Sequence, residues 1–259
     1  MLRWFRADLH IHTVLSACAD LSMGPRDIVA RALAQELDLI AITDHNSSAN
    51  ATAVFHAAQG TGLTVIPGME ISTREEIHMI CLFPDLHQAM KFQDYVYSNL
   101  QDGTYDASML GPQVICDHNE NILGEDDHML ALPIKISYDR VIKETVAQGG
   151  FIYPAHIDRR ANGIMRVLGF MPKDLPYNVV EVSKNIPLQE AEERYGQQGS
   201  VAVITASDAH EISQIASAVT FFRMAAPTFA ELCLAMQFQD DRKVSIVPPK
   251  AIIHQLKAV

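Results

Sequence analysis

The sequence predicts an α/β fold in which short strands alternate with helices around a largely parallel sheet. Apolar runs with the length of strands alternate with helical segments along most of the 259 residues. Histidines and carboxylates stand where several of these strands end, and α/β folds collect their reactive groups there. A chain of this length fits a single α/β unit, so we expect residues 1–259 to form one domain.

The first part of the chain predicts four strands and two helices. The strands are expected at residues 5–11, 37–43, 63–71 and 77–83. After the first strand, Gly24 and Pro25 begin a helix, because proline is favoured in the first helical turn and apolar residues recur behind it. A second helix, made largely of small residues, is expected at about 49–60.

The regular alternation is interrupted between residues 101 and 136. Clusters of Gly, Asp, Asn and Glu predict turns at 117–121 and 124–127, and we interpret the whole segment as an insertion. The alternation then resumes with a helix at 137–148 and strands at 151–154, 179–182 and 201–206. Thr228 and Glu231 have the spacing of a capping box, which predicts the start of a last helix.

Composition excludes several classes of protein. An apolar fraction of 48% indicates a globular chain, and no run of about 18 apolar residues or signal-peptide pattern is present. We therefore expect a cytoplasmic protein without a membrane segment. A net charge of −11 disfavours binding to long nucleic acids. The widely spaced Cys18, Cys81, Cys116 and Cys233 indicate neither disulfides nor a cysteine-rich zinc module.

The polar residues at the strand ends have the chemistry of metal ligands. Asp8, His10 and His12 alternate along the end of the first strand, so they share one face. Later strand ends carry Asp44, His45, Glu70, His78, His156, Asp208 and His210. Imidazole and carboxylate suit Zn²⁺, Fe²⁺ and Mn²⁺, so together these residues predict a multinuclear metal site. No role is expected for His56, His87, His118, His128 and His254.

The motifs resemble those of the PHP (polymerase and histidinol phosphatase) family. They are Asp8-x-His10-x-His12, Thr43-Asp44-His45, Glu70, His78, Pro154-Ala155-His156 and Ser207-Asp208-Ala209-His210, in the order of the family. The resemblance spans nearly the whole chain and implies a distorted (β/α)7 barrel, with the insertion at about 101–136. It also implies a trinuclear metal centre and phosphoester hydrolysis by a stand-alone phosphoesterase.

The resemblance implies two to three divalent transition-metal ions, Zn, Mn or Fe. One ion would be held by His10, His12 and Asp208. Glu70 would bridge it to a second ion, held by His78 and His156. His45 and His210 would hold the third, together with a ligand from the loop after the first strand.

Two residues compete for that last position. Asp20 is favoured, because its spacing to Pro25 fits the family pattern and a carboxylate suits an oxygen-rich site; Cys18 is the alternative. Asp8 and Asp44 would orient imidazoles by accepting a hydrogen bond from the second ring nitrogen.

The predicted reaction is the attack of a metal-activated hydroxide on a small phosphomonoester or nucleotide. Asp208 or His210 would supply the proton to the leaving group. Arg159 is the first candidate to bind the phosphate and Lys184 the second. The acidic residues 125–127 predict that the insertion is a lid that favours small substrates over nucleic-acid chains.

Two other functions fit parts of the pattern. Amidohydrolase barrels also begin with an HxH strand, so hydrolysis of a C–N or ester bond is one alternative, and a non-catalytic metal-binding regulatory module is another. The Thr43-Asp44-His45 motif favours the phosphoesterase, because it points to a third metal. Substrate, metal identity and oligomeric state are left open by the sequence.

Overall fold

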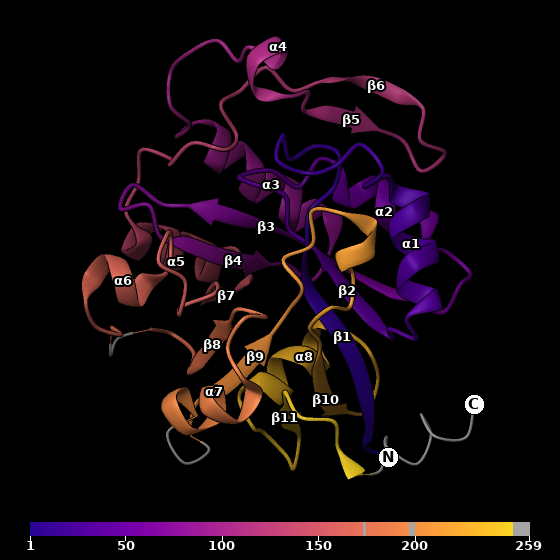
Figure 1. Ribbon diagram of the computed structural model, residues 1–259, viewed down its shortest axis with the longest axis vertical. Helices are drawn as coiled ribbons and strands as arrows, with labels where there is room; N and C mark the ends of the chain where they lie inside the picture. The colour runs from indigo at the N-terminus through magenta and orange to yellow at the C-terminus, as the bar shows by residue number, and fades with distance from the viewer. Residues whose placement is uncertain (173–174, 197–199, 251–259) are drawn as a thin grey trace.

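A curled mixed sheet forms a half-barrel at the centre of the fold (Figure 1). The computed structural model describes residues 1–172, 175–196 and 200–250. The order of the seven strands in the sheet is β11 (Lys243–Ser245), β10 (Thr220–Met224), β1 (Arg3–Ile11), β2 (Leu39–Ile42), β3 (Thr64–Ser72), β4 (His78–Leu82) and β7 (Phe151–Pro154). A separate parallel pair, β8 (Val179–Val182) and β9 (Ala202–Thr205), lies beside it.

The sheet is less parallel than the sequence predicts. Only β1, β2 and β3 run parallel to one another in the large sheet; β4 is antiparallel to β3 and β7, and β10 is antiparallel to β1 and β11. The connection from β3 to β4 consists of residues 73–77, which is too short for a crossover helix. The chain therefore makes a hairpin there, and the prediction of a largely parallel sheet is wrong at this point.

Helices pack around the outside of the strands. They are α1 (Pro25–Ala34), α2 (Ala51–Ala57), α3 (Leu86–Tyr97), α4 (Ala107–Leu110), α5 (Tyr138–Ala147), α6 (Ile164–Leu168), α7 (Leu188–Tyr195), α8 (Phe229–Met236) and the 3₁₀ turn η2 (Ile212–Gln214). The sequence analysis missed α3, although Asp85 caps its first turn by accepting from the Gln88 N–H. Its buried Ala89, Phe92 and Val96 also follow helical spacing.

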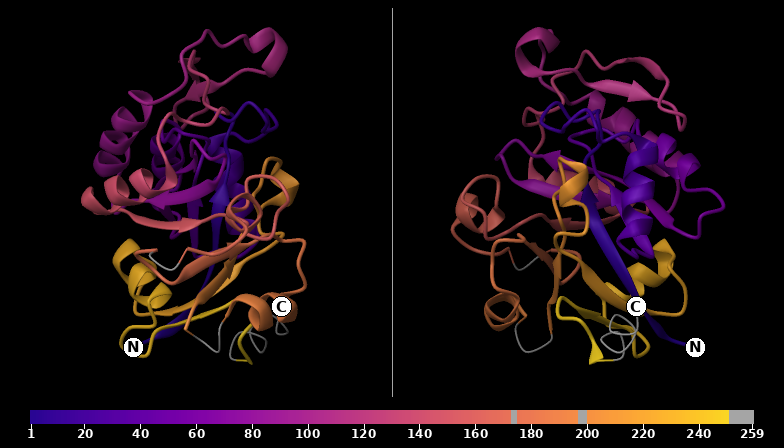
Figure 2. Two further views of the ribbon diagram at one scale, coloured as in Figure 1. Left: turned by 90° about the vertical axis from the view of Figure 1, so that its left-hand side faces the viewer. Right: turned by 45° about the vertical axis from the view of Figure 1, so that its right-hand side comes forward.

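The insertion forms a layer of its own at the top of the molecule (Figures 1 and 2). It contains α4 and the hairpin of β5 (Val114–Cys116) and β6 (Ile122–Glu125). The predicted turn at 117–121 connects these two strands, whereas the predicted turn at 124–127 is wrong because β6 continues to Glu125. The side chain of Asn50 ties the hairpin to the barrel by bonds to the Val114 carbonyl and the Cys116 N–H.

None of the described helices is long and apolar enough to span a bilayer.

Candidate metal centre

Six segments bring the predicted ligands to one edge of the half-barrel. His10 and His12 lie at the carboxyl end of β1, His45 follows β2, Glu70 lies near the end of β3, His156 follows β7, and Asp208 and His210 follow β9. His78 is the first residue of β4, and antiparallel pairing puts it opposite Ser72 at the end of β3. The hairpin thus returns His78 to the edge where the parallel strands end.

Glu70 is the centre of the cluster. Its buried carboxylate lies 2.7 Å from His78 Nδ1, 2.9 Å from His156 Nε2 and 3.1 Å from His45 Nδ1. Burial would raise the pKa of Glu70, but the imidazoles of His78 and His10 lower it well below its ordinary value. An ionised carboxylate ringed by imidazoles is suited to bridge two cations.

The tautomers of His10 and His12 test whether the residues fit a metal. His10 Nδ1 donates to Glu181, at 2.9 Å. His12 Nδ1 donates to Ser16 Oγ, because the one hydroxyl proton of Ser16 goes to Asp44. When both rings are neutral, each Nε2 atom carries a lone pair, and these two atoms lie 3.2 Å apart. One divalent ion can accept both of these lone pairs, so the pair fits a metal ion.

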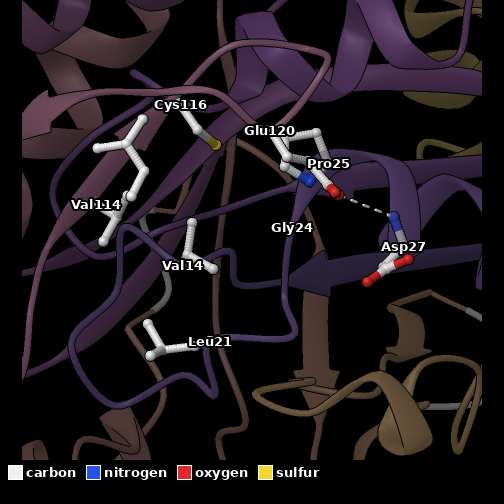
Figure 3. Close-up of a pocket in the computed structure, with 9 residues that line it drawn as sticks. Val14, Leu21, Gly24, Pro25, Asp27, Val114, Cys116 and Glu120 are labelled. Atoms are coloured by element: carbon white, nitrogen blue, oxygen red, sulfur yellow. Dashed lines mark hydrogen bonds between the residues drawn. The ribbon is translucent and has the colours of Figure 1, made fainter.

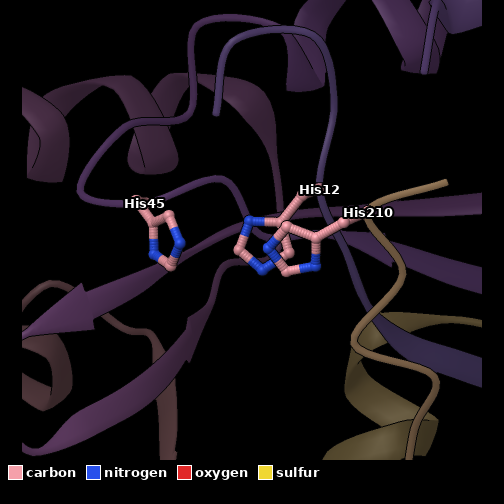
Figure 4. A group of neighbouring side chains, drawn as sticks. All are labelled: His12, His45 and His210. Carbon is pink, nitrogen blue, oxygen red and sulfur yellow. The ribbon is translucent and has the colours of Figure 1, made fainter. Parts of the chain in front are cut away.

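Three sets of ligand atoms, each within 4.8 Å of one another, are present among the described residues. They are His10, His12 and Asp208; His12, His45 and His210; and His45, Glu70 and His78. In the second set the His12 and His210 rings stack at 4.2 Å between centroids, and the His45 ring lies 4.5 Å from that of His12 (Figure 4). His56, His87, His118 and His128 belong to none of these sets, and His254 lies outside the described residues.

Asp20 does not join the cluster. Its exposed carboxylate accepts from the Ser22 N–H at 2.8 Å, within its own turn. Cys18 instead lies within hydrogen-bonding reach of His45 and His210. Desolvation opposes ionisation of the thiol, but these two imidazoles lower the pKa of Cys18 to about 6.

The predicted orienting roles of Asp8 and Asp44 are corrected by their contacts. Asp8 accepts from the Ser207 and Ala216 N–H groups, and burial raises its pKa to about 6. Asp44 accepts from Thr13 and from Ser16 Oγ, so it reaches His12 only through the Ser16 hydroxyl. Both aspartates therefore hold loops in place rather than contacting an imidazole.

Glu181 was missed by the sequence analysis. Its Oε1 accepts from His10 Nδ1 and from the His156 N–H, while Oε2 is buried with no hydrogen-bond partner. The signal was present in the sequence, because Glu181 is the one charged residue in the four-residue apolar strand β8. A buried charge needs a partner, and here that partner is a predicted metal ligand.

Two cations lie beside the cluster. Arg159 Nη1 is 2.6 Å from Asp208 Oδ2, and Lys184 Nζ donates to the Ser207 carbonyl at 2.8 Å. Both line a cavity of about 170 Å³, together with His156, Glu181, Ser183, Asn185, Ala206 and Asp208. The cavity therefore brings predicted metal ligands together with two positively charged side chains.

Backbone conformation also distinguishes the site. His156 and Asp208 have φ values of 27° and 48°, in the left-handed region that non-glycine residues rarely adopt. Such strain is retained where the surrounding structure enforces it, and it is common at functional sites.

Fold and site together define a half-barrel with a cluster of histidines and carboxylates suited to divalent metal ions. The PHP domain family matches residues 8–154, more than half of the chain. The chain belongs to this family.

Similar proteins include enzymes that act on nucleic acids. The 5'-3' exoribonuclease Rnm of Salmonella typhimurium is 39% identical over 90 residues, which are 32% of this chain and 30% of that protein. The lesion-specific endonuclease EndoQ of Pyrococcus furiosus has a similar fold, with a TM-score of 0.69 at 16% identity, over 93% of this chain and 58% of that one. This chain thus spans only part of either protein.

A smaller neighbour is similar over most of its own length. It is a protein from Bifidobacterium adolescentis inferred to be a metal-dependent phosphoesterase, with a TM-score of 0.53 at 18% identity. The similarity covers 79% of this chain and 87% of that one.

Proposed function

We propose that this protein is a metal-dependent phosphoesterase that hydrolyses small phosphorylated molecules. The observation that carries the proposal is the cavity that His156, Asp208 and Glu181 line together with Arg159 and Lys184. Membership of the PHP family and the inferred phosphoesterase among its structural neighbours support it. With divalent ions bound at the cluster, this cavity would attract an anionic phosphate although the whole chain carries a net charge of −11.

Divalent ions, when bound, would supply Lewis-acid stabilisation of the phosphoryl group and an activated water. The side chains proposed to hold them are His10, His12, His45, Glu70, His78, His156, Asp208 and His210. His210 and Asp208 are the proposed proton donors to the leaving group, and His210 Nδ1 lies 3.0 Å from the Asp208 carbonyl.

Arg159 is the proposed phosphate-binding residue. Its guanidinium pairs with Asp208, and an incoming phosphate can compete for the same donors, because arginine binds phosphate in a bidentate manner. Lys184 would add a point charge, since it lines the same cavity.

A 5'-3' exoribonuclease is among the similar proteins, and this favours a second candidate function. That function is the release of nucleotides from the 5' end of RNA. The proposed lid offers less acidic surface than the sequence suggests. Asp126 is buried and bonded to Tyr97 and His128, so only Glu125 and Asp127 of that stretch are exposed. A short oligonucleotide therefore belongs among the test substrates.

The test is hydrolysis by Mn²⁺- or Zn²⁺-loaded protein of phosphomonoesters, mononucleotides, short RNA and long single-stranded DNA. We expect turnover of the small phosphoesters. Processive degradation of long strands would contradict the preference for small substrates. Cleavage of amide or carboxyl-ester substrates alone would identify an amidohydrolase-like enzyme, and metal binding without any turnover would identify a binding module.

A further inference from the structure

The cavity beside the metal cluster is small for a substrate. Its volume is about 170 Å³, and Arg159, Asp208 and His156 are among its lining residues. Pockets that hold small molecules in proteins measure about 300–1,000 Å³. The cavity therefore has room for a phosphoryl group, and the organic part of a phosphoester must lie outside it.

A larger pocket adjoins this cavity at Lys184, which lines both spaces. The pocket measures about 400 Å³ and lies among α7, β9, β10 and β11, which Figure 1 shows gathered in the lower half of the molecule. We call it the Phe221 pocket. The apolar side chains that line it include Ile186, Leu188, Ala218, Val219, Phe221 and Ile246.

Lys184 is anchored at both ends. Its ammonium donates to the Ser207 carbonyl at 2.8 Å, directly before Asp208 in the chain. The backbone beside it is held, because the Ser183 N–H and hydroxyl both donate to Asp158 at 2.6 Å. Lysine is flexible, so its ammonium can turn to a phosphate oxygen while its apolar stem stays against the Phe221 pocket.

The Phe221 pocket suits an apolar group. Phe221 and Ile246 are buried, and Leu188 and Val219 are half-buried. Two polar groups of the lining are already engaged, since Thr205 Oγ1 donates to the Val182 carbonyl at 3.2 Å and the Arg6 guanidinium donates to the Gln35 carbonyl. A polar ligand would therefore gain little here, whereas an apolar one would leave water.

Another pocket lies between the insertion and the start of α1 (Figure 3). It measures about 250 Å³, and Val14 and Leu21 line it together with Val114 and Cys116. No described residue lines both this pocket and the cavity at the metal cluster. A phosphoester bound at the cluster is therefore better placed to reach the Phe221 pocket.

We propose that the Phe221 pocket binds the organic part of the substrate, and that the substrate is a phosphomonoester with an apolar organic group. Its phosphate lies in the cavity with Arg159 and Lys184, and its apolar group passes Lys184 to contact Leu188 and Phe221. The inference rests on the proposed function, because it uses the phosphate position given there.

A series of alkyl phosphates tests the substrate class, because the chemistry of the leaving group changes little with chain length. Burial of one methylene strengthens binding by up to about fourfold. We therefore expect kcat/KM of the metal-loaded, full-length protein to rise by about tenfold or more from ethyl to hexyl phosphate. Equal values along the series would overturn the proposal.

Ala218→Phe tests the location, because it fills the pocket from a half-buried position of its lining. The ratio of kcat/KM for hexyl and ethyl phosphate should fall toward one. Leu188→Ala, which removes a wall of the pocket, should lower the same ratio and serves if Ala218→Phe does not fold. Ala230→Phe, an exposed change in α8, is the matched control and should keep the wild-type ratio. A wild-type ratio in folded Ala218→Phe and Leu188→Ala would place the alkyl chain elsewhere and overturn the proposal.

Calorimetric titration with ethylphosphonate and hexylphosphonate separates this inference from the proposed function, because both compounds bind without being hydrolysed. Binding of hexylphosphonate about tenfold tighter, in a protein that hydrolyses no phosphoester, would support the pocket and contradict the activity. Hydrolysis together with equal affinity for the two phosphonates would support the phosphoesterase and overturn the pocket.

Discussion

Single hydrogen bonds decide how the imidazoles of this centre are presented. His10 Nδ1 and His12 Nδ1 are both engaged, by Glu181 and Ser16, so each ring offers only Nε2 to an ion. Hydrogen bonds of this kind fix the ring and raise its basicity, and removing such a partner costs metal affinity. Glu181 is the stronger case, because its acceptor is a buried carboxylate and Ser16 offers only a hydroxyl.

Glu181→Ala should weaken the affinity of the centre for Zn²⁺ by about 10- to 100-fold. Glu181→Gln should lose less Zn²⁺ affinity, because the amide oxygen can still accept a hydrogen bond from His10. Competition with a chromogenic chelator measures both constants. Glu125→Ala, an exposed change in β6, is the control. Wild-type affinity in Glu181→Ala would show that His10 needs no partner to bind.

Arg159→Ala should lower kcat/KM for a phosphomonoester by about tenfold or more, equivalent to about 1.4 kcal/mol. The metal content should stay unchanged, because a guanidinium has no lone pair with which to bind a cation. Steady-state kinetics and elemental analysis of the same preparation measure the two quantities.

Arg160→Ala is the matched control, as its neighbour in the chain with an exposed side chain. Normal kinetics in both Arg159→Ala and Lys184→Ala would remove these two residues from the substrate site.

At the scale of elements, local signals predict α1, α2, α5 and α8 but miss α3, and they predict strand neighbours poorly. The predicted start of the last helix at Thr228 is confirmed as an N-cap, since its hydroxyl accepts from the Glu231 N–H at 3.3 Å. The side chain of Glu231 does not return to the cap, however. It accepts from Nε and Nη2 of Arg242 at 2.8 and 2.7 Å and so joins α8 to the segment before β11.

Glu231→Gln should destabilise the protein by about 1 to 2 kcal/mol at pH 7. Hydrogen bonds from Arg242 lower the pKa of Glu231 from 4.5 to about 2. The stabilisation is therefore complete above pH 4.5 and disappears as the pH falls toward 2. Urea unfolding across this range should show the wild type and the variant converging.

Glu190→Gln, which breaks the more exposed Glu190–Arg194 pair in α7, should cost less than about 1 kcal/mol. A pH-independent difference between Glu231→Gln and the wild type would show that the ion pair is not its cause.

At the scale of the whole molecule, the metal centre joins segments from both ends of the chain. His10 and Glu181 are 171 residues apart in sequence, and the Ser207 N–H donates to Asp8 across 199 residues. The clustered imidazoles of the metal-free protein repel one another once protonated, so bound ions should stabilise the entire fold.

Removing metal should therefore lower the melting temperature by about 5 °C or more, since ligand at 100 times Kd contributes about 2.7 kcal/mol. Differential scanning fluorimetry with a chelator, followed by addition of Zn²⁺, measures the loss and the recovery. Glu70→Gln should show little response to Zn²⁺, because it lacks the central carboxylate. An identical shift in Glu70→Gln would place the stabilising ion elsewhere.

The sequence by itself determined the α/β class, most strands and the identity of eight clustered side chains. Residue types and spacing suffice for this, because alternation fixes which face of a strand a residue occupies, and strand ends fix which edge it reaches. The strands at 151–154 and 179–182 were predicted with their observed bounds, and His10 and His12 share a site as the period of two requires.

Only the tertiary structure decided which strands pair and which side chains lie next to the predicted ligands. It showed that β4 returns antiparallel to β3, that Glu181 rather than Asp8 orients His10, and that Cys18 rather than Asp20 faces His45 and His210. Each of these depends on how the chain turns between elements or on contacts between distant segments. Periodicity along the sequence carries no information about such contacts, because it records the face of an element and not what packs against it.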